Sequence, residues 1–150
     1  MAYMSDLIKL YDTGTQKRKM LYICSNKCMS IVYYQKGLIH KIDKPAITIK
    51  GLDGRIYTQA WFYLGKPHRV NNPALIYKRD DVEKYEWWNN GIIHNTSGPA
   101  VITNSNNFYE EYWMIDGKMH RDNGPAYISK TSICTIKLWF DKNKMIDPKN

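Results

Sequence analysis

The chain has 150 residues, of which 43% are hydrophobic and 24% charged, as in an ordinary globular protein with one modest core. Three cysteines without a C-x-x-C pair indicate neither a disulfide framework nor a zinc knuckle, and no segment contains the roughly 20 apolar residues of a membrane-spanning helix. The net charge of +8 permits an anionic partner.

Residues 1–30 lack the pattern that fills the rest of the chain, and we interpret them as an atypical, basic N-terminal cap. The stretch "KMLYIC" predicts a strand within it. Charged residues interrupt the apolar positions at the start, so we expect no secretory leader and an intracellular protein that is neither secreted nor transmembrane.

Basic charge is concentrated in the first third of the chain. Residues 1–50 hold nine lysines and arginines against three aspartates and glutamates, and Lys17, Arg18 and Lys19 form the densest run. Such a run is either a solvated turn or a contact for nucleic acid or an anionic membrane surface.

Four segments of residues 31–146 align without gaps: "YYQKGLIHKIDKPAITI", "WFYLGKPHRVNNPALIY", "WWNNGIIHNTSGPAVIT" and "WMIDGKMHRDNGPAYIS". In each, an aromatic residue stands four positions before a glycine, a histidine three positions after it, and Pro-Ala five positions after the histidine. The aromatic column is Tyr33, Trp61, Trp87, Trp113 and, in a truncated fifth copy, Trp139; the glycines are Gly37, Gly65, Gly91 and Gly117; the histidines are His40, His68, His94 and His120; the prolines are Pro45, Pro73, Pro99 and Pro125.

The unit predicts β structure. Asn90-Gly91 and Asp116-Gly117 are typical of two-residue type I′ hairpin turns, in which both residues have positive φ. The aromatic segment, the histidine segment and the segment after Pro-Ala then give about three short strands per repeat. We therefore predict an all-β fold, an antiparallel β-meander of repeated hairpins that forms an elongated single sheet, followed by a C-terminal tail at residues 147–150.

Neighbouring positions of the aromatic segment are apolar in every copy, so both faces of the sheet carry aromatic side chains at this level. A single layer with two apolar faces needs to curl, to be covered or to pair with another copy. Because the chain has little sequence left for a covering layer, we expect a homodimer.

The four histidines suggest a metal or acid/base site, but three strands per repeat would separate equivalent side chains by roughly 14 Å, which is too far for shared zinc ligation. A lone histidine with a local aspartate lacks a nucleophile and an oxyanion hole. We therefore expect no catalytic residue, no metal and no cofactor, and interpret the histidines as structural groups that hydrogen-bond turn backbone.

The repeats resemble MORN repeats, and more closely the MORN-like variant with G-x-x-H-R-x-D-G-P-A units found in large DNA viruses, some phages and their hosts. The resemblance covers residues 31–146. It implies an elongated sheet of hairpins, often dimeric, that works as a scaffold or adaptor without enzyme activity, with links to membranes or phosphoinositides in some members. The variant pattern also suggests a viral source.

Two functions remain open from the sequence. The first is a structural scaffold or protein-protein interaction module that self-associates, because tryptophan and tyrosine are typical interface anchors and the chain has 5 Trp and 12 Tyr. The alternative is binding of nucleic acid or an anionic membrane surface through the basic N-terminal third.

Overall fold

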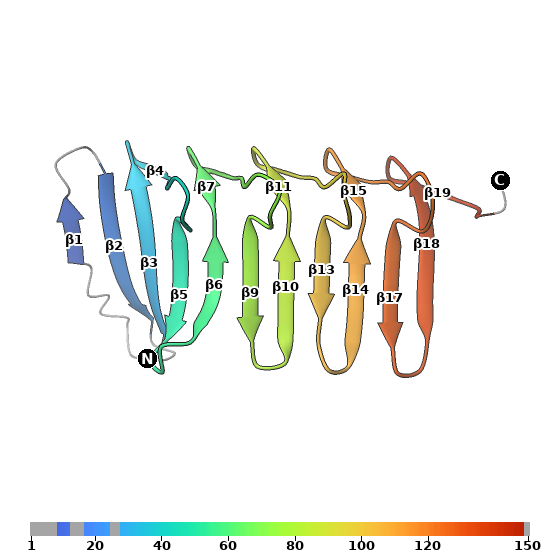
Figure 1. Cartoon of the computed structure of the whole chain (residues 1–150), viewed down its shortest axis with the longest axis horizontal. Coiled ribbons are helices and arrows are strands. Elements are labelled where there is room, and N and C mark those ends of the chain that lie inside the picture. Colours follow the sequence, from blue (N-terminus) through green and yellow to red (C-terminus); the bar gives the residue numbers. More distant parts are fainter. Residues whose placement is uncertain (1–8, 13–16, 25–27, 149–150) are drawn as a thin grey trace, which may run out of the picture.

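The computed structural model describes residues 9–12, 17–24 and 28–148, with side chains from residue 28 onward. This part of the chain contains strands and turns and no helix, so none of it forms a helix that could cross a membrane. Figure 1 shows the strands side by side in the order of the sequence, as a long row that does not close on itself. The all-β, antiparallel meander predicted from the repeats is confirmed.

One 13-stranded antiparallel sheet contains all the long strands, and three small hairpins lie beside it. Its strands are β1 (Lys9–Asp12), β2 (Lys17–Cys24), β3 (Cys28–Gln35), β4 (Leu38–Ile39), β5 (Ile47–Gly51), β6 (Ile56–Ala60), β9 (Leu75–Arg79), β10 (Val82–Glu86), β13 (Val101–Asn104), β14 (Phe108–Tyr112), β17 (Tyr127–Thr131), β18 (Thr135–Asp141) and β19 (Lys144–Ile146). The small hairpins are β7 (Phe62–Tyr63) with β8 (Lys66–Pro67), β11 (Trp88–Asn89) with β12 (Ile92–Ile93), and β15 (Met114–Ile115) with β16 (Lys118–Met119).

The second, third and fourth repeats each have four strands, two long and two short, because the aromatic residue separates the long strand from the first strand of the small hairpin. The prediction of about three strands is one too few for these repeats. It holds for the first repeat, where β3 runs on through Tyr33 and pairs with β4. In the second repeat the Trp61 N–H donates to the Ala74 carbonyl (2.7 Å), and the His68 N–H donates to the Trp61 carbonyl (3.1 Å).

The hairpin turns have the geometry that the Asn-Gly and Asp-Gly pairs predicted. Asn90 and Gly91 have φ values of 50° and 85°, and Asp116 and Gly117 have 49° and 75°. Leucine or lysine occupies the first position of this turn in other repeats with similar backbone angles, so the sheet context imposes the turn even where the local residue disfavours positive φ.

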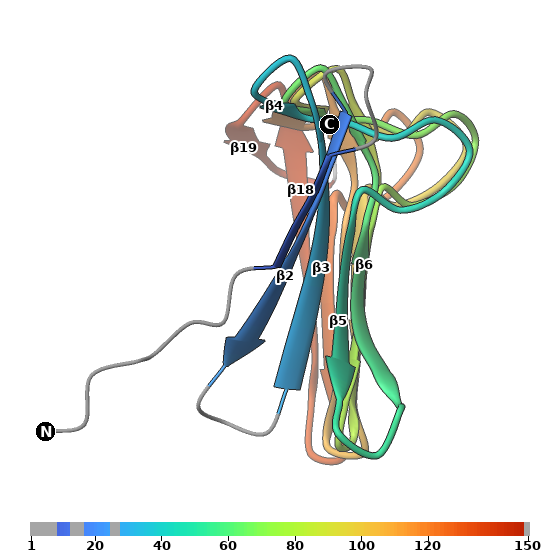
Figure 2. The same cartoon turned by 90° about the vertical axis from the view of Figure 1, so that its left-hand side faces the viewer.

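The two faces of the large sheet differ. The face that carries the aromatic column, here called the loop face, is covered at one end by the histidine-to-proline loops, which project to one side of the sheet in Figure 2. The opposite face, here called the open face, has no such loops. A row of directly paired residues crosses nine strands on the open face: Val32, Ile47, Ala60, Leu75, Glu86, Val101, Tyr112, Tyr127 and Leu138.

The core is thin because the sheet is a single layer. Among the described residues no large side chain is fully buried, and the residues with no exposed surface are the alanines of the four Pro-Ala pairs. Each alanine lies between the aromatic segment of its own repeat and the next long strand. Contacts between neighbouring repeats, and not a central core, therefore hold the fold together.

The basic run of residues 17–19 lies in strand β2, which pairs with β1 and β3. The interpretation of this run as a solvated turn was therefore wrong, because cross-strand pairing extends to the first residue of β2. The side chains of Lys17, Arg18 and Lys19 lie outside the described part of the structure, and their contact with an anion stays a prediction.

Candidate interaction site

The small hairpins of successive repeats are joined by backbone hydrogen bonds. In the second, third and fourth repeats the N–H of the turn glycine donates to a carbonyl of the preceding hairpin: Gly65 to Ile39 (2.8 Å), Gly91 to Pro67 (2.9 Å), and Gly117 to Ile93 (2.9 Å). The truncated fifth repeat continues this contact, since the Asn143 N–H donates to the Met119 carbonyl (2.9 Å). The glycine column therefore lies at the contact between one hairpin and the hairpin before it.

Three histidines accept a hydrogen bond from the turn of the next repeat, more than 20 residues later. Nδ1 of His40 accepts from the Leu64 N–H (3.1 Å), Nδ1 of His68 from the Asn90 N–H (3.2 Å), and Nδ1 of His94 from the Asp116 N–H (3.0 Å). The hydrogen bonds of these three histidines therefore connect neighbouring repeats. They do not join the histidine to the turn that directly follows it.

His120, in the last complete repeat, lies between two carboxylates. Its Nε2 is 3.0 Å from Asp122 Oδ1, and its Nδ1 is 3.1 Å from Asp141 Oδ1. The second contact is short enough for an ion pair but lacks the angle of a hydrogen bond, so Nδ1 is otherwise without a partner.

The separation of the histidines was overestimated. Because each repeat adds two strands to the large sheet, neighbouring repeats are offset by roughly 10 Å, not 14 Å. The Tyr63 ring lies between two of the histidines, with ring centroids 5.1 Å from His40 and 6.3 Å from His68. In the part of the chain that the structure describes, no three His, Cys, Asp or Glu residues are grouped so that they could hold a metal ion.

Replacing His40 by alanine is expected to lower the free energy of unfolding by about 2 kcal/mol, because the half-buried Leu64 N–H loses its acceptor and the Tyr63 ring loses its partner. Urea denaturation followed by circular dichroism measures the change. His68→Ala is the matched variant and is expected to lose less, since His40 is 7% exposed whereas His68 is only partly buried. Equal stability of His40→Ala and the wild type would contradict the role of this hydrogen bond.

The residue after the histidine covers the aromatic ring of its own repeat. The Arg69 guanidinium carbon lies 3.7 Å from the centroid of the Trp61 ring, the Arg121 guanidinium carbon lies 3.6 Å from that of Trp113, and the Lys41 ammonium lies 3.3 Å from that of Tyr33. These are cation–π contacts. Sequence reasoning missed them, although a basic residue next to three of the four histidines was the available signal.

Both arginines also close the loop that follows. Nη1 of Arg69 donates to the Pro73 carbonyl, and Nη1 of Arg121 donates to the Pro125 carbonyl, each at 3.2 Å. Partial burial lowers the pKa of Arg69 from its ordinary value. Ring, guanidinium and carbonyl therefore form one unit that fastens the histidine-to-proline loop to the sheet.

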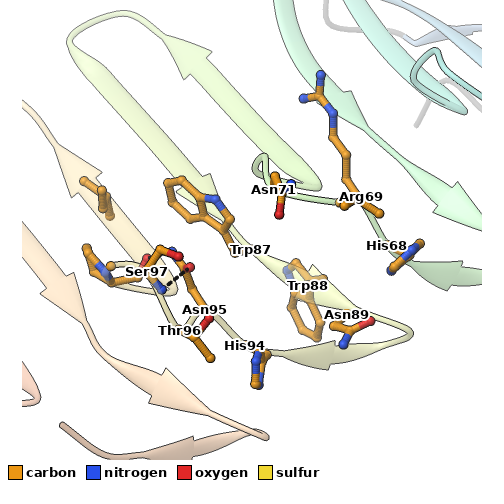
Figure 3. A pocket seen from close by; sticks show the side chains of 14 residues that line it. His68, Arg69, Asn71, Trp87, Trp88, Asn89, His94, Asn95, Thr96 and Ser97 are labelled. Carbon is orange, nitrogen blue, oxygen red and sulfur yellow. Dashed lines mark hydrogen bonds between the residues drawn. The ribbon is translucent and has the colours of Figure 1, made fainter. Parts of the chain in front are cut away.

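The third repeat differs at this position, where Asn95 replaces the basic residue. Its Nδ2 donates to the Pro99 carbonyl (2.9 Å), and its Oδ1 accepts from the Ser97 N–H (3.1 Å). The amide thus makes the loop contact of the arginines but does not cover the ring. A cavity of about 630 Å³ lies over Trp87, between the loops of the second and third repeats, and Arg69 is among the residues that line it (Figure 3).

Tyrosines and glutamates of β14 and β17 form two hydrogen-bonded groups, one on each face of the large sheet. The Tyr109 hydroxyl donates to Glu111 (2.9 Å), and the Tyr127 hydroxyl donates to Glu110 (2.9 Å) and packs against the Tyr112 ring, with centroids 4.8 Å apart. Burial, together with the neighbouring carboxylates, raises the pKa of Tyr109 and of Tyr112 to about 12. The folded protein therefore holds both phenols neutral beyond their ordinary pKa of 10.

Alkaline pH is expected to destabilise the fold. Below the ordinary pKa of 10 both phenols are protonated in the folded and unfolded chains; between 10 and about 12 the unfolded chain loses these protons first, so the free energy of unfolding falls as pH rises. Urea denaturation across this interval, with tyrosinate absorbance as the titration signal, measures the effect. Tyr109→Phe and Tyr112→Phe together should flatten the decline, and an unchanged slope would contradict the assignment.

Comparison with protein-family models, curated proteins and solved structures found no match for this chain. Fold and site together define an all-β repeat protein whose repeats are joined through hairpin turns, histidines and cation-covered aromatic rings.

Proposed function

We propose that the protein is a non-enzymatic, MORN-like repeat protein that acts as a structural scaffold or protein-protein interaction module and associates with a second copy of itself. We place it inside the cell, or inside an infected host cell if the source is viral, as the resemblance to the variant repeats suggests. The open face of the sheet is the proposed surface of association.

The observation that carries this proposal is the apolar row on the open face. Eight of the nine residues that cross the sheet there are uncharged and apolar or aromatic, with Glu86 as the exception. The equivalent row on the loop face is more polar, since it includes Thr48, Gln59, Glu111 and Lys137. Val32, Ala60 and Val101 are already buried in the single chain, and the other members of the row are partly buried. The described residues supply no second layer for either face, and an apolar strip rimmed by polar groups is typical of a protein interface.

Mass in solution tests the self-association. Light scattering on the purified chain should give twice the monomer mass of 17.7 kDa. Ile136, 47% exposed and on the open face, is suited to a charge substitution that leaves the fold intact, and Ile136→Glu should raise the dissociation constant at least about tenfold, as expected for a buried unpaired charge. A monomeric wild type would refute the proposal.

The control variant is Ile133→Glu. Ile133 is 93% exposed and lies in the turn between β17 and β18, away from the row on the open face. It adds the same charge to the same region, so the mass should stay that of the wild type. Equal weakening by both variants would mean that net charge, and not the open face, controls association.

The charge asymmetry of the chain favours one second candidate, binding of nucleic acid or an anionic membrane surface through the N-terminal third. Residues 1–50 hold nine basic and three acidic side chains, and the basic run begins β2, next to the edge strand β1. Replacing Lys17, Arg18 and Lys19 by glutamine should abolish salt-sensitive binding to single-stranded oligonucleotides or acidic vesicles. Unchanged binding would exclude this run as the contact.

A further inference from the structure

The aromatic column provides an internal comparison, because the same position recurs in four complete repeats. In the first, second and fourth repeats a cation of the chain itself lies over the ring, at 3.3, 3.7 and 3.6 Å from the centroid. In the third repeat no cation of the described residues lies over Trp87. The third repeat thus presents the ring without the group that covers it elsewhere.

The space over this ring is correspondingly larger. The equivalent cavity over Trp61, where Arg69 covers the ring, has a volume of about 440 Å³, compared with about 630 Å³ over Trp87. Trp87 and Trp88 form the aromatic side of the larger cavity. Asn95 also lines it, and its side-chain amide hydrogen-bonds the backbone of the loop. Figure 3 shows the Trp87 indole at the cavity.

The third repeat is richer in carboxylates than the rest of the chain. Residues 80–117 contain seven carboxylates and a single lysine or arginine, Lys84, whereas the whole chain has a net charge of +8. Among the described residues, Arg69 is the one lysine, arginine or carboxylate that lines the cavity, but two carboxylates adjoin lining residues. Glu86 accepts from the Trp88 indole. Glu111 pairs directly with Ile102. Its carboxylate accepts from the Trp113 indole and from the Tyr109 hydroxyl.

We propose that the cavity over Trp87 binds the guanidinium group of an arginine side chain presented by a partner polypeptide. The arginine takes the position that Arg69 and Arg121 occupy in their own repeats, stacked on the indole and close to the Pro99 carbonyl. Arginine fits better than lysine because its planar group stacks on the ring and points its donors along the plane.

A nucleobase is the alternative planar group that stacks on an indole. The internal comparison favours arginine, because the equivalent positions over Trp61 and Trp113 hold guanidinium groups of the chain itself. The difference between the two groups is the basis of the test, in which a neutral planar group, a cationic planar group and an anionic nucleotide are compared.

The binding test uses N-acetyl-arginine amide as the probe, with N-acetyl-citrulline amide as the neutral analogue of the same shape and adenosine monophosphate as the nucleotide. The indole N–H signals of the 15N-labelled full chain are followed by NMR, and Trp87→Phe identifies the Trp87 signal. We expect the arginine probe to shift this signal about threefold more than citrulline at equal concentration. An equal response to citrulline, a larger response to the nucleotide, or no response would overturn the proposal.

Two exchanges between repeats make the test independent of any single variant. Asn95→Arg should place a guanidinium over Trp87 from within the chain and abolish the shift caused by the probe, whereas Asn95→Gln should retain it. Arg69→Asn should uncover Trp61 and make its indole signal respond to the arginine probe. Binding at Trp87 that persists in a folded Asn95→Arg variant, or a Trp61 signal that stays silent in Arg69→Asn, would contradict the proposal.

The inference deepens the proposed interaction function, since it names the chemistry of a partner, but it uses a different surface. The cavity lies on the loop face and self-association is assigned to the open face. A monomeric chain that still binds the arginine probe would refute only self-association, and a dimer that ignores the probe would refute only the arginine site.

Discussion

Replacing Trp61 by alanine is expected to lower the free energy of unfolding by about 3 kcal/mol, at the lower end of the range for large aromatic residues in cores. Trp61 is 8% exposed and is the largest side chain among the buried hydrophobic residues. Its ring supports Arg69, whose Nη1 in turn holds the Pro73 carbonyl. The substitution therefore removes the buried ring, the cation–π contact and the anchor of one loop together.

Urea denaturation followed by circular dichroism measures this loss, and the corresponding fall in Tm should be roughly 6–12 °C for a chain of this size. Trp87→Ala is the matched control, because it removes the same ring from the same column where no arginine covers it. We expect it to lose about 1 kcal/mol less than Trp61→Ala, the value of a partly buried cation–π contact. A larger loss for Trp87→Ala would contradict the contribution of Arg69.

Replacing Ala74 by leucine is expected to lower the free energy of unfolding by about 3 kcal/mol, because the added atoms have no space. Ala74 has no exposed surface, its N–H donates to the Glu86 carbonyl (2.8 Å), and its carbonyl accepts from the Trp61 N–H (2.7 Å). Backbone on both sides is thus fixed by hydrogen bonds. The larger side chain has to push the aromatic segment away from the next strand.

Ala74→Gly tests whether size is the cause. It removes one methyl group without adding volume and should lose only about 1 kcal/mol, mainly through the greater backbone freedom of glycine. A leucine variant as stable as the wild type would show that this position can accommodate a larger side chain. The alanine of each Pro-Ala pair would then need an explanation other than size. Both variants can be compared by the same urea denaturation.

Local patterns predicted the turns and the repeat correctly because they depend on neighbouring residues. Asn90-Gly91 and Asp116-Gly117 adopt positive φ as expected, since these residue types tolerate it with little cost. The register of four aligned copies then made an antiparallel meander the simplest arrangement. The number of strands per repeat was not predictable in the same way, because it depends on whether the long strand is interrupted at its aromatic residue, as at Trp61 but not at Tyr33.

Contacts between repeats were the part that the sequence did not reveal. His40 reaches the turn at Leu64, 24 residues later, and no local pattern indicates this partner. The basic residue after the histidine was visible as a column, but its position over the ring depends on how the loop folds back on the sheet. In the sequence, Asn95 was therefore indistinguishable from ordinary variation. Only the structure shows that it replaces the residue that covers the aromatic ring in the other repeats.

By itself the sequence determined the all-β class, the hairpin turns and the period of the repeat, because short-range backbone preferences and the alternation of side chains along a strand are encoded in adjacent residues. Only the tertiary structure decided which face is open, which turn each histidine holds and which ring is uncovered. Those features depend on packing between units that are about 26 residues apart, and packing is set by the joint geometry of strands, loops and side chains.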